Sequence, residues 1–496
     1  MTNIVKVLFT KYSLYPKLMR IHFFVAIFLF LASSIYAQDS TFQYSASVSL
    51  AGSTGQSPFW LYSNQNGIVP VSGSFILGDF AAYKVYNPNN PRIFQWSAGA
   101  ELIASYGKER NDKAGDYFLN DLYVAGRIGP VEFLAGQKKS IMGLVDTLLS
   151  SGSLAMSGNA RPVPGFKISI PEFLPLHFTN DLVALKASYF DGRLGQGDVA
   201  YGSARSVPNI YLHQKSLYLR FGKNSHRLKV YAGINHQAIW GGEDKISPIQ
   251  NLNRIDAYGY VILGRNLDAR KVGSHFGTTD LGIEWRENDW TYFLYRQNIY
   301  DTGSLFKVIN LTDGLNGFSI KRNKRQKKTE SFLINSFLFE VAGTQKQTNN
   351  SPLSDLTIFR TGDYYNSYIY KQGYSYKGSS IGTPLIPGQN TTDQELPRNK
   401  TGFTNSNRSW VFHSGLTASW LNTYFLFRGT YSRNFGTFVQ PFETVKQQIS
   451  LQVSAEKKVK FLKNGSFFAS FYSDIGSLYP VSTSLLIGYR RSGLIW

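Results

Sequence analysis

The densest group of side chains suited to holding a ligand lies in one short stretch of the C-terminal half. Its members are Asp363, Tyr364, Tyr365, Asn366, Tyr374 and Tyr376. Aromatic faces pack on the C–H surfaces of sugars, and planar polar groups pair their hydroxyls, which otherwise cost about 1–3 kcal/mol each to bury. We therefore predict a glycan-contact region here. The same tyrosines could form an interfacial girdle or pack a loop against a rim, so both alternatives stay open.

Trp240 is a further candidate for glycan contact. It follows a strand-like run, together with His236, and precedes Gly241 and Gly242. Because paired glycines permit a tight turn, closure of that turn is the alternative role for this segment.

A second candidate site is a run of basic residues that contains no acid. Its cations are Lys321, Arg322, Lys324, Arg325, Lys327 and Lys328. A concentrated positive patch raises the local density of anions. On a cell exterior it would attract acidic polysaccharide or the phosphates of lipopolysaccharide, whereas on the opposite side of a membrane it would be a solvated turn.

Residues with the spacing of known catalytic sites are scarce. The chain has no cysteine, no His-Glu-x-x-His zinc pattern and no Walker-type phosphate loop, and its 7 histidines are scattered. We predict no enzyme activity, no cofactor and no metal site. A site assembled from distant strands is the alternative that spacing does not exclude.

The elements that would position these residues are strands of alternating polarity. In Gln448–Ala455, apolar Ile449, Leu451 and Val453 alternate with polar neighbours. Side chains of a strand point alternately to its two faces, so one face suits lipid and the other suits water.

The same alternation recurs along the whole chain. It is clear at 183–189, 216–221, 227–235 and 281–286. Further strands are expected to begin near Phe42, Phe75, Ile93, Tyr117, Val131, Trp290, Phe332, Trp410, Thr423, Phe467 and Ser484. The pattern predicts about sixteen strands by this count.

Alternation alone fits both a soluble β-sandwich and a membrane barrel. In the barrel the apolar face is outside and the polar face lines a wet lumen. The 31 tyrosines and 36 phenylalanines suit aromatic girdles, and the chain ends on an aromatic residue, Trp496. We predict an all-β fold, a transmembrane antiparallel β-barrel.

The N-terminus has the three parts of a secretory signal. Lys6, Lys11, Lys17 and Arg20 precede an apolar core at Phe23–Leu31, and the small Ala37 fits a cleavage site. The apolar stretch is shorter than the roughly 20 residues needed to cross a bilayer. We predict a cleaved signal peptide at 1–37 and a single barrel domain at 38–496, located in the outer membrane.

Residues 139–160 lack alternation and are rich in Ser, Gly, Leu and Met. They predict a small helical or irregular element that plugs the lumen or caps the periplasmic mouth. An ordinary long loop is the alternative.

Several short motifs, taken in order, resemble one known family. They are Pro58–Leu61, Asn66–Gly67, Ser157–Pro164, His213–Leu217, Gly233–Gly242, Asp313–Leu315, Gly362–Asn366, Gly373–Tyr376, Ile381–Leu385 and Ser432–Gly436. Together they resemble the capsule assembly protein Wzi family, in its Bacteroidetes form. Each motif alone is weak, whereas their order is specific.

The resemblance implies an outer-membrane β-barrel of about 18 strands with a helical element on the periplasmic side. It implies a lectin-like surface protein that binds and helps to retain or assemble capsular polysaccharide. The partners expected are this or other surface polysaccharide, outer-membrane lipid and lipopolysaccharide, with no nucleic acid, and the protein is expected to be a monomer. A passive or selective porin is the alternative, since Lys186, Arg220 and Lys229 would give the lumen a preference for anions.

Overall fold

The computed structural model describes residues 41–90, 92–108, 113–200, 202–246, 252–267, 270–301, 312–323, 332–347, 362–459 and 464–494. The predicted signal peptide, 1–37, lies outside these residues. Its cleavage, and the domain boundary that depends on it, stay predictions.

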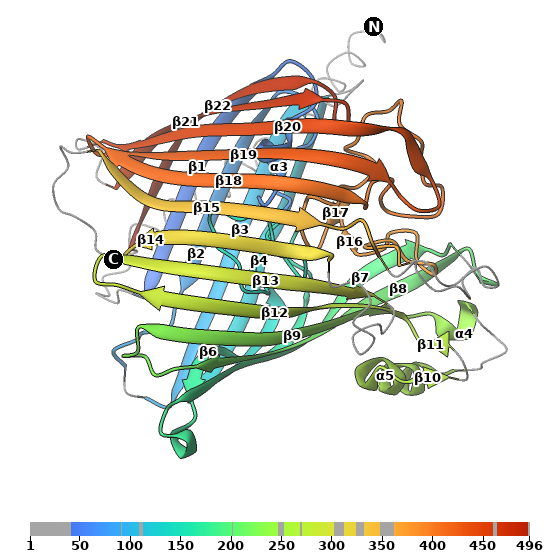
Figure 1. Ribbon diagram of the computed structural model, residues 1–496, viewed down its shortest axis with the longest axis horizontal. Coiled ribbons are helices and arrows are strands. Elements are labelled where there is room, and N and C mark those ends of the chain that lie inside the picture. Colours follow the sequence, from blue (N-terminus) through green and yellow to red (C-terminus); the bar gives the residue numbers. More distant parts are fainter. Residues whose placement is uncertain are drawn as a thin grey trace, which may run out of the picture.

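The described residues form one closed sheet of 18 antiparallel strands (Figure 1). The strands are β1 (Phe42–Ser53), β2 (Phe75–Lys84), β3 (Phe94–Lys108), β4 (Lys113–Ile128), β5 (Val131–Gln137), β6 (Gly165–Pro175), β7 (Val183–Asp198), β8 (Ser206–Phe221), β9 (Leu228–Trp240), β12 (Ser274–Arg286), β13 (Trp290–Asp301), β14 (Gly314–Arg322), β15 (Leu333–Gly343), β18 (Ser409–Trp420), β19 (Thr423–Gly436), β20 (Pro441–Lys458), β21 (Gly465–Gly476) and β22 (Ser482–Leu494). Pairing of β1 with β22 closes the barrel, with Val48 opposite Tyr489. The predicted barrel is confirmed.

The strand count agrees with the resemblance and exceeds the count from alternation by two. Sixteen of the strands were expected from the pattern, and the two that it missed are β6 and β14.

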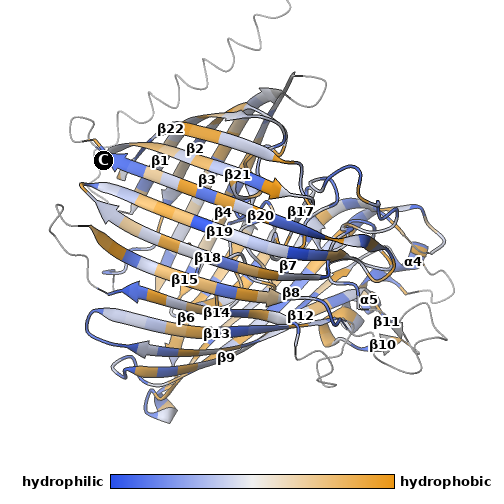
Figure 2. Ribbon diagram, turned by 45° about the horizontal axis from the view of Figure 1, so that its top comes forward, coloured by the Kyte–Doolittle hydropathy of each residue, from blue (hydrophilic) through white to orange (hydrophobic). Residues whose placement is uncertain are grey.

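The barrel turns its apolar face outward. On β20, Val453 is 49% exposed while its neighbour Gln452 is 3% exposed. On β9, Leu228 is 48% exposed whereas Lys229 is 6% exposed. Hydrophobic and hydrophilic residues alternate along the strands in Figure 2. This distribution is the inverse of a soluble sandwich and is the one that a bilayer requires.

Exposed aromatic side chains lie toward both ends of the barrel. Phe94, Trp96, Trp285 and Trp420 lie near the end that carries the short turns. Tyr106, Tyr117 and Trp410 lie near the opposite end. Two such bands are the aromatic girdles of membrane barrels.

The two ends of the barrel differ in the length of their connections. The connections longer than ten residues all lie at one end, which we call the long-loop end; they are 54–74, 138–164, 241–273, 302–313 and 344–408. The other end carries the start of β1, the last strand residue Leu494 and short turns such as the one between Trp420 and Thr423. We call it the terminus end.

The remaining elements are short. They are α3 (Phe59–Tyr62), the 3-10 turn η1 (His177–Thr179), α4 (Glu243–Ile246), α5 (Arg254–Leu263), and the strand pairs β10 (Asn266–Leu267) with β11 (Arg270–Lys271) and β16 (Ser375–Tyr376) with β17 (Ser379–Ser380). In Figure 1, α5 and β10 lie beside the barrel, next to the long-loop end. The expected plug segment, 139–160, is irregular and contains no helix.

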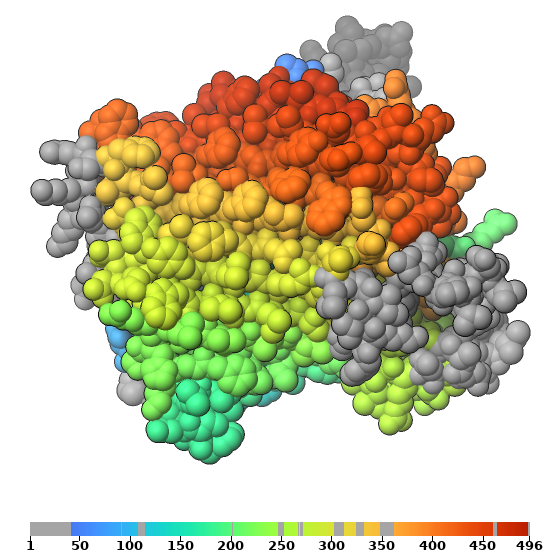
Figure 3. Space-filling view, in the orientation of Figure 1, coloured from blue at the N-terminus to red at the C-terminus, as the bar shows by residue number. Residues whose placement is uncertain are grey.

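No helix in the described part of the chain is both long and apolar enough to span a membrane. The space-filling view shows a continuous wall of strand residues on the face it presents (Figure 3).

Candidate functional site

Three segments from the long-loop end fold back into the barrel. They are the α3 loop (54–74), the plug (138–164) and the tyrosine loop (362–408). Trp60, Leu154 and Tyr365, one from each segment, belong to the same buried apolar cluster. The lumen therefore contains a packed core that wall residues and three folded-back segments share.

Carboxylates that point inward from the wall hold the plug. Glu340 on β15 accepts hydrogen bonds from the Ser150 hydroxyl at 2.6 Å and from the Ser151 amide at 2.7 Å. The Tyr295 hydroxyl donates to the same carboxylate. A buried carboxylate with several donors is satisfied, so it fixes the plug against the wall.

Other wall residues extend this attachment to both halves of the plug. Asp280 on β12 accepts from the Leu144 amide at 3.2 Å. A ring nitrogen of His413 on β18 contacts the Leu149 carbonyl oxygen at 2.7 Å. These contacts attach the segment to wall residues of β12 and β18, as expected for an element that enters the lumen.

The first two tyrosines of the predicted glycan region connect the tyrosine loop to its surroundings. The Tyr365 hydroxyl donates to the Leu154 carbonyl of the plug at 2.7 Å and accepts from the Thr383 amide at 2.9 Å. The Tyr364 hydroxyl donates to Asp313, just before β14, at 3.1 Å. These rings link the loop to both plug and wall.

Asp363 is the centre of a second cluster of contacts within the loop. Its carboxylate accepts from the Asn366 amide at 2.9 Å and also from the Asn407 amide. The Asn366 side-chain oxygen in turn accepts from the Thr404 backbone amide at 2.9 Å. Burial raises the pKa of Asp363, and the two side-chain amides partly oppose that rise.

The structure separates the predicted glycan residues into a buried set and an accessible one. Tyr364, Tyr365 and Tyr374 are 0%, 1% and 2% exposed, so their faces are packed against protein. Tyr376 is half-buried, and Tyr368 on the same loop is 41% exposed. Only the accessible tyrosines have ring surface that a ligand could contact directly. The buried tyrosines position the loop.

Trp240 is buried on the outer wall beneath α5. Its ring lies 5.0 Å from that of Tyr211 and 5.3 Å from that of Tyr258 on the helix. Gly241 and Gly242 follow with φ of 125° and 81°, a conformation that other residues rarely adopt. These contacts support the turn-closing alternative for this segment.

Polar side chains attach α5 to outward-facing strand positions. The Tyr258 hydroxyl donates to Asp191 at 2.5 Å, and His213 contacts the same carboxylate at 2.9 Å. Beside His213 lie His236 and His275, whose own ring centroids are 5.0 Å apart. Histidines that are scattered in the sequence thus converge, yet no group of metal-ligating residues with suitable geometry occurs within the described ranges.

The two described members of the basic run contact protein groups at the terminus end. Lys321 forms an ion pair with Asp146 of the plug at 2.7 Å. The Arg322 guanidinium lies 4.4 Å from the Trp290 ring centre and donates to the Ile334 carbonyl at 3.1 Å. Lys324, Arg325, Lys327 and Lys328 lie outside the described residues.

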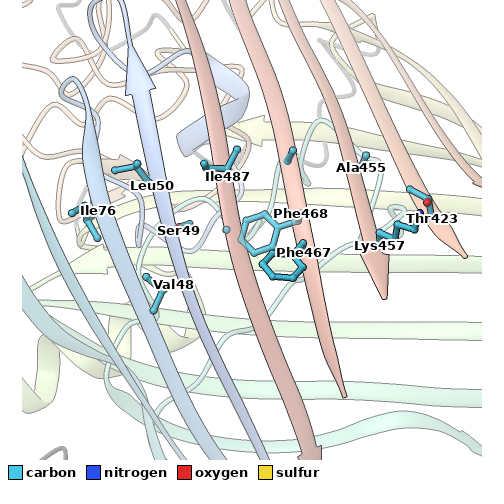
Figure 4. Close-up of a pocket in the computed structure, with 12 residues that line it drawn as sticks. Val48, Ser49, Leu50, Ile76, Thr423, Ala455, Lys457, Phe467, Phe468 and Ile487 are labelled. Atoms are coloured by element: carbon cyan, nitrogen blue, oxygen red, sulfur yellow. The ribbon is translucent and has the colours of Figure 1, made fainter. Parts of the chain in front are cut away.

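Two cavities lie in the lumen and one hollow lies on the outer wall. The lumenal cavities measure about 290 and 220 Å³. The outer hollow measures about 760 Å³ and is lined by outward-facing Val48, Leu50, Ile76, Phe467 and Ile487 (Figure 4). Its apolar lining suits hydrocarbon and offers little to sugar hydroxyls.

One serine has the Gly-x-Ser-x-Gly spacing of esterase nucleophiles, at Gly378–Gly382. That serine, Ser380, is 1% exposed, and its hydroxyl donates to the Thr383 carbonyl and accepts from Asn159. It lies on β17 and not on a strand-to-helix turn, so the spacing carries no nucleophile here.

A family model and one solved structure agree with this architecture. A family model described as capsule assembly protein Wzi matches residues 43–392. A solved structure of Wzi, described as an outer-membrane protein involved in group 1 capsule assembly in Escherichia coli and a carbohydrate-binding β-barrel, is 14% identical, with a TM-score of 0.56 over 94% of this chain and 86% of that one. Acinetobacter baumannii OccAB2 is 10% identical, with a TM-score of 0.45 over 92% of this chain and 99% of that one. No curated protein matches the chain.

Proposed function

Because the chain belongs to the capsule assembly protein Wzi family, we propose that this outer-membrane β-barrel binds capsular polysaccharide and helps to retain or assemble it at the cell surface. The observation that carries the proposal is the tyrosine loop. Its buried side is anchored to plug and wall, and it still has accessible aromatic residues at the long-loop end.

We orient the barrel with its terminus end in the periplasm. Outer-membrane barrels have short periplasmic turns and longer extracellular loops, and in this chain no connection at the terminus end is longer than ten residues. The long-loop end then faces the exterior, where a polysaccharide layer lies.

In this orientation, Tyr368 and Tyr376 are the proposed aromatic contacts. Lys371 and Lys377 are exposed on the same loop and add hydrogen-bond donors and positive charge. Asp363, Tyr364, Tyr365, Asn366 and Tyr374 act beneath them, by holding the loop in one conformation. Pre-organised contacts lower the entropy lost on binding.

The basic run has a different proposed partner. With β14 ending in the periplasm, Arg322 at its end would meet anions on that side, such as inner-leaflet phospholipid headgroups or polysaccharide in transit, whereas Lys321 already pairs with Asp146. Outer-leaflet lipopolysaccharide would instead contact the outward residues of the wall. Because β1 pairs with β22, the barrel has no open sheet edge to which a second copy could add a strand, and we propose a monomer.

A porin remains the second candidate, because lumenal Lys186 and Arg220 would favour anions in a conducting pore, whereas Lys229 is paired with Glu284. The packed segments in the lumen favour binding over conduction. Planar-bilayer recordings separate the two: steady open-channel current supports the porin, and its absence together with polysaccharide binding supports the proposal.

The direct test replaces the accessible pair, Tyr368→Ala with Tyr376→Ala. Loss of two aromatic contacts should weaken binding of purified protein to capsular polysaccharide by at least about fivefold, because tyrosines are enriched among the few contact residues whose truncation costs more than about 1 kcal/mol. Phe178→Ala, which removes an aromatic ring that is 87% exposed in η1 at the terminus end, is the control and should bind as the parent does. Unchanged binding by a well-folded double variant would reject this contact surface.

A further inference from the structure

The larger lumenal cavity, about 290 Å³, lies between the plug and the inner faces of β5 to β8. Its charged lining residues are Glu132, Lys138, Lys139, Arg161, Lys167 and Lys186. They come from the plug and from three different strands, so the cavity exists only in the closed barrel.

Two of these cations already have acidic partners. Lys139 pairs with Glu101 at 2.5 Å, and Arg161 pairs with Asp116 at 3.0 Å. Their charges are therefore matched by groups of the protein itself.

The other three cations have only weak or neutral partners among the described residues. Lys167 reaches the Ser140 hydroxyl at 3.4 Å, Lys138 lies 4.6 Å from the Tyr123 ring centre, and Lys186 has no hydrogen bond or ion pair there. Lys138 and Lys186 are close enough to repel the Lys167 ammonium, and Glu132 is the acid that attracts it. The cavity thus carries an excess of positive charge.

The second lumenal cavity shows that this imbalance is not general. It is lined by Asp79, Glu456 and Arg490, and Arg490 lies 3.5 Å from Glu456. With two carboxylates and one guanidinium, this cavity has no excess of positive charge, whereas the larger cavity has one.

Uncharged donors complete the larger cavity. The Ser169 side chain is 4% exposed, and its hydroxyl has no hydrogen-bond partner in the described part of the chain. Ser188 and Ser216 line the same wall, with their hydroxyl oxygens 2.7 Å apart. A buried hydroxyl without a partner is uncommon, so it points to a ligand or water that would complete it.

We propose that this cavity binds a sugar-sized oxyanion, with Lys138, Lys167 and Lys186 around its carboxylate or phosphate and the serines on its hydroxyls. The volume is at the lower end for small-molecule sites. Ammonium groups form strong charge-assisted hydrogen bonds with such anions. That the anion is a unit of an acidic glycan rests on the proposed function, whereas the site itself does not.

The test titrates full-length protein in detergent with glucuronate, inorganic phosphate and uncharged glucose, at constant ionic strength. At least one anion should bind at least about tenfold more tightly than glucose. Binding of glucuronate alone identifies a carboxylated sugar, and binding of phosphate identifies a phosphorylated ligand. If neither anion binds more tightly than glucose, the proposal is overturned.

Two variants locate the binding. Lys167→Gln with Lys186→Gln should weaken anion binding at least about tenfold, and Lys138→Gln on the plug gives an independent reading if the strand variants do not fold. Arg490→Gln, in the second lumenal cavity, is the matched control and should bind anions as the parent does. Equal binding by the lysine variants would place the anion elsewhere and reject the site.

The same variants distinguish this inference from the proposed function. Anion binding that depends on the lysines, in a protein that retains no capsular polysaccharide, would leave the cavity standing and reject the polysaccharide role. Retention of capsular polysaccharide by a protein that binds no anion would support the polysaccharide role and reject the cavity as an anion site.

Discussion

At the scale of single residues, the plug depends on a few inward-pointing carboxylates. Glu340 accepts hydrogen bonds from Ser150, Ser151 and Tyr295 in a buried position. Removing an acceptor leaves each donor unpaired, at about 1–3 kcal/mol per donor. The attachment of the plug is therefore sensitive to a single side chain on β15.

We expect Glu340→Ala to lower the free energy of unfolding by at least about 3 kcal/mol and to increase hydrogen exchange in the plug. Glu172→Ala is the control, since Glu172 is 79% exposed and lies 3.9 Å from Arg127; exposed pairs of this kind contribute about 0–1 kcal/mol. Equal thermal unfolding of the two variants in detergent would contradict this role of Glu340.

The buried carboxyl of Asp363 makes the stability of the protein depend on pH. Burial raises its pKa, so the folded loop binds a proton at pH values where the unfolded chain has released it. Stability contributed by this group is therefore highest below the ordinary aspartate pKa of about 3.9 and falls as pH rises through the raised value.

Asp363→Asn removes the titrating group, so the stability difference between parent and variant should change with pH in that window and become constant above it. Thermal unfolding followed by near-ultraviolet circular dichroism, which reports on packed tyrosines, measures this difference. A constant difference from pH 3 to 7 would show that the pKa is not raised.

At the scale of elements, the segments that enter the lumen decide what the barrel can do. The α3 loop, the plug and the tyrosine loop share one apolar cluster. A barrel of this size without them would have a wide polar lumen, as in porins. Binding at one end, and not passage through the lumen, is the activity that a filled barrel favours.

Replacing residues 139–160 by a short glycine-serine linker should raise the conductance of the barrel in planar bilayers, because the plug is the element between β5 and β6 that occupies the lumen. The Tyr364→Phe protein, with its plug intact, is the control and should stay closed. A closed barrel after plug removal would mean that the other two segments suffice to block it.

At the scale of the whole molecule, the outward apolar surface dictates the environment. Neighbouring positions on β20 illustrate this: Val453 is 49% exposed on the outer face, and Ser454 lines a lumenal cavity. One strand thus meets hydrocarbon on one side and water on the other.

We expect Val453→Arg to destabilise the barrel in lipid bilayers by about 2–4 kcal/mol, the range found for charged residues on the lipid face near the midplane. Ser454→Arg, one position along, should cost much less because its side chain enters a polar cavity. Reversible unfolding from vesicles compares the two, and a larger effect at Ser454 would invert the assignment of faces.

The sequence by itself determined most of the barrel. Alternation located sixteen strands, and it failed at β6 and β14 for local reasons. Pro171 interrupts β6, where the register shifts between Ile170 and Leu174. On β14, Gly317 has no side chain, which leaves room for the Tyr295 ring and interrupts the alternation. Motif order also identified the family, which the family model confirms.

Only the tertiary structure decided which side chains are available. The alternation of polar and apolar residues is the same whether the apolar face of a strand points into the barrel or out of it. Only the exposed fractions of the side chains showed that the apolar face is outside. The tyrosines of residues 364–374 were noticed for their type, yet contacts with Leu154, Asp313 and Phe276, far away in sequence, bury most of them. One cavity is lined by Lys138, Lys167 and Lys186 because barrel closure and insertion of the plug bring them together. Their spacing in the sequence does not indicate this proximity.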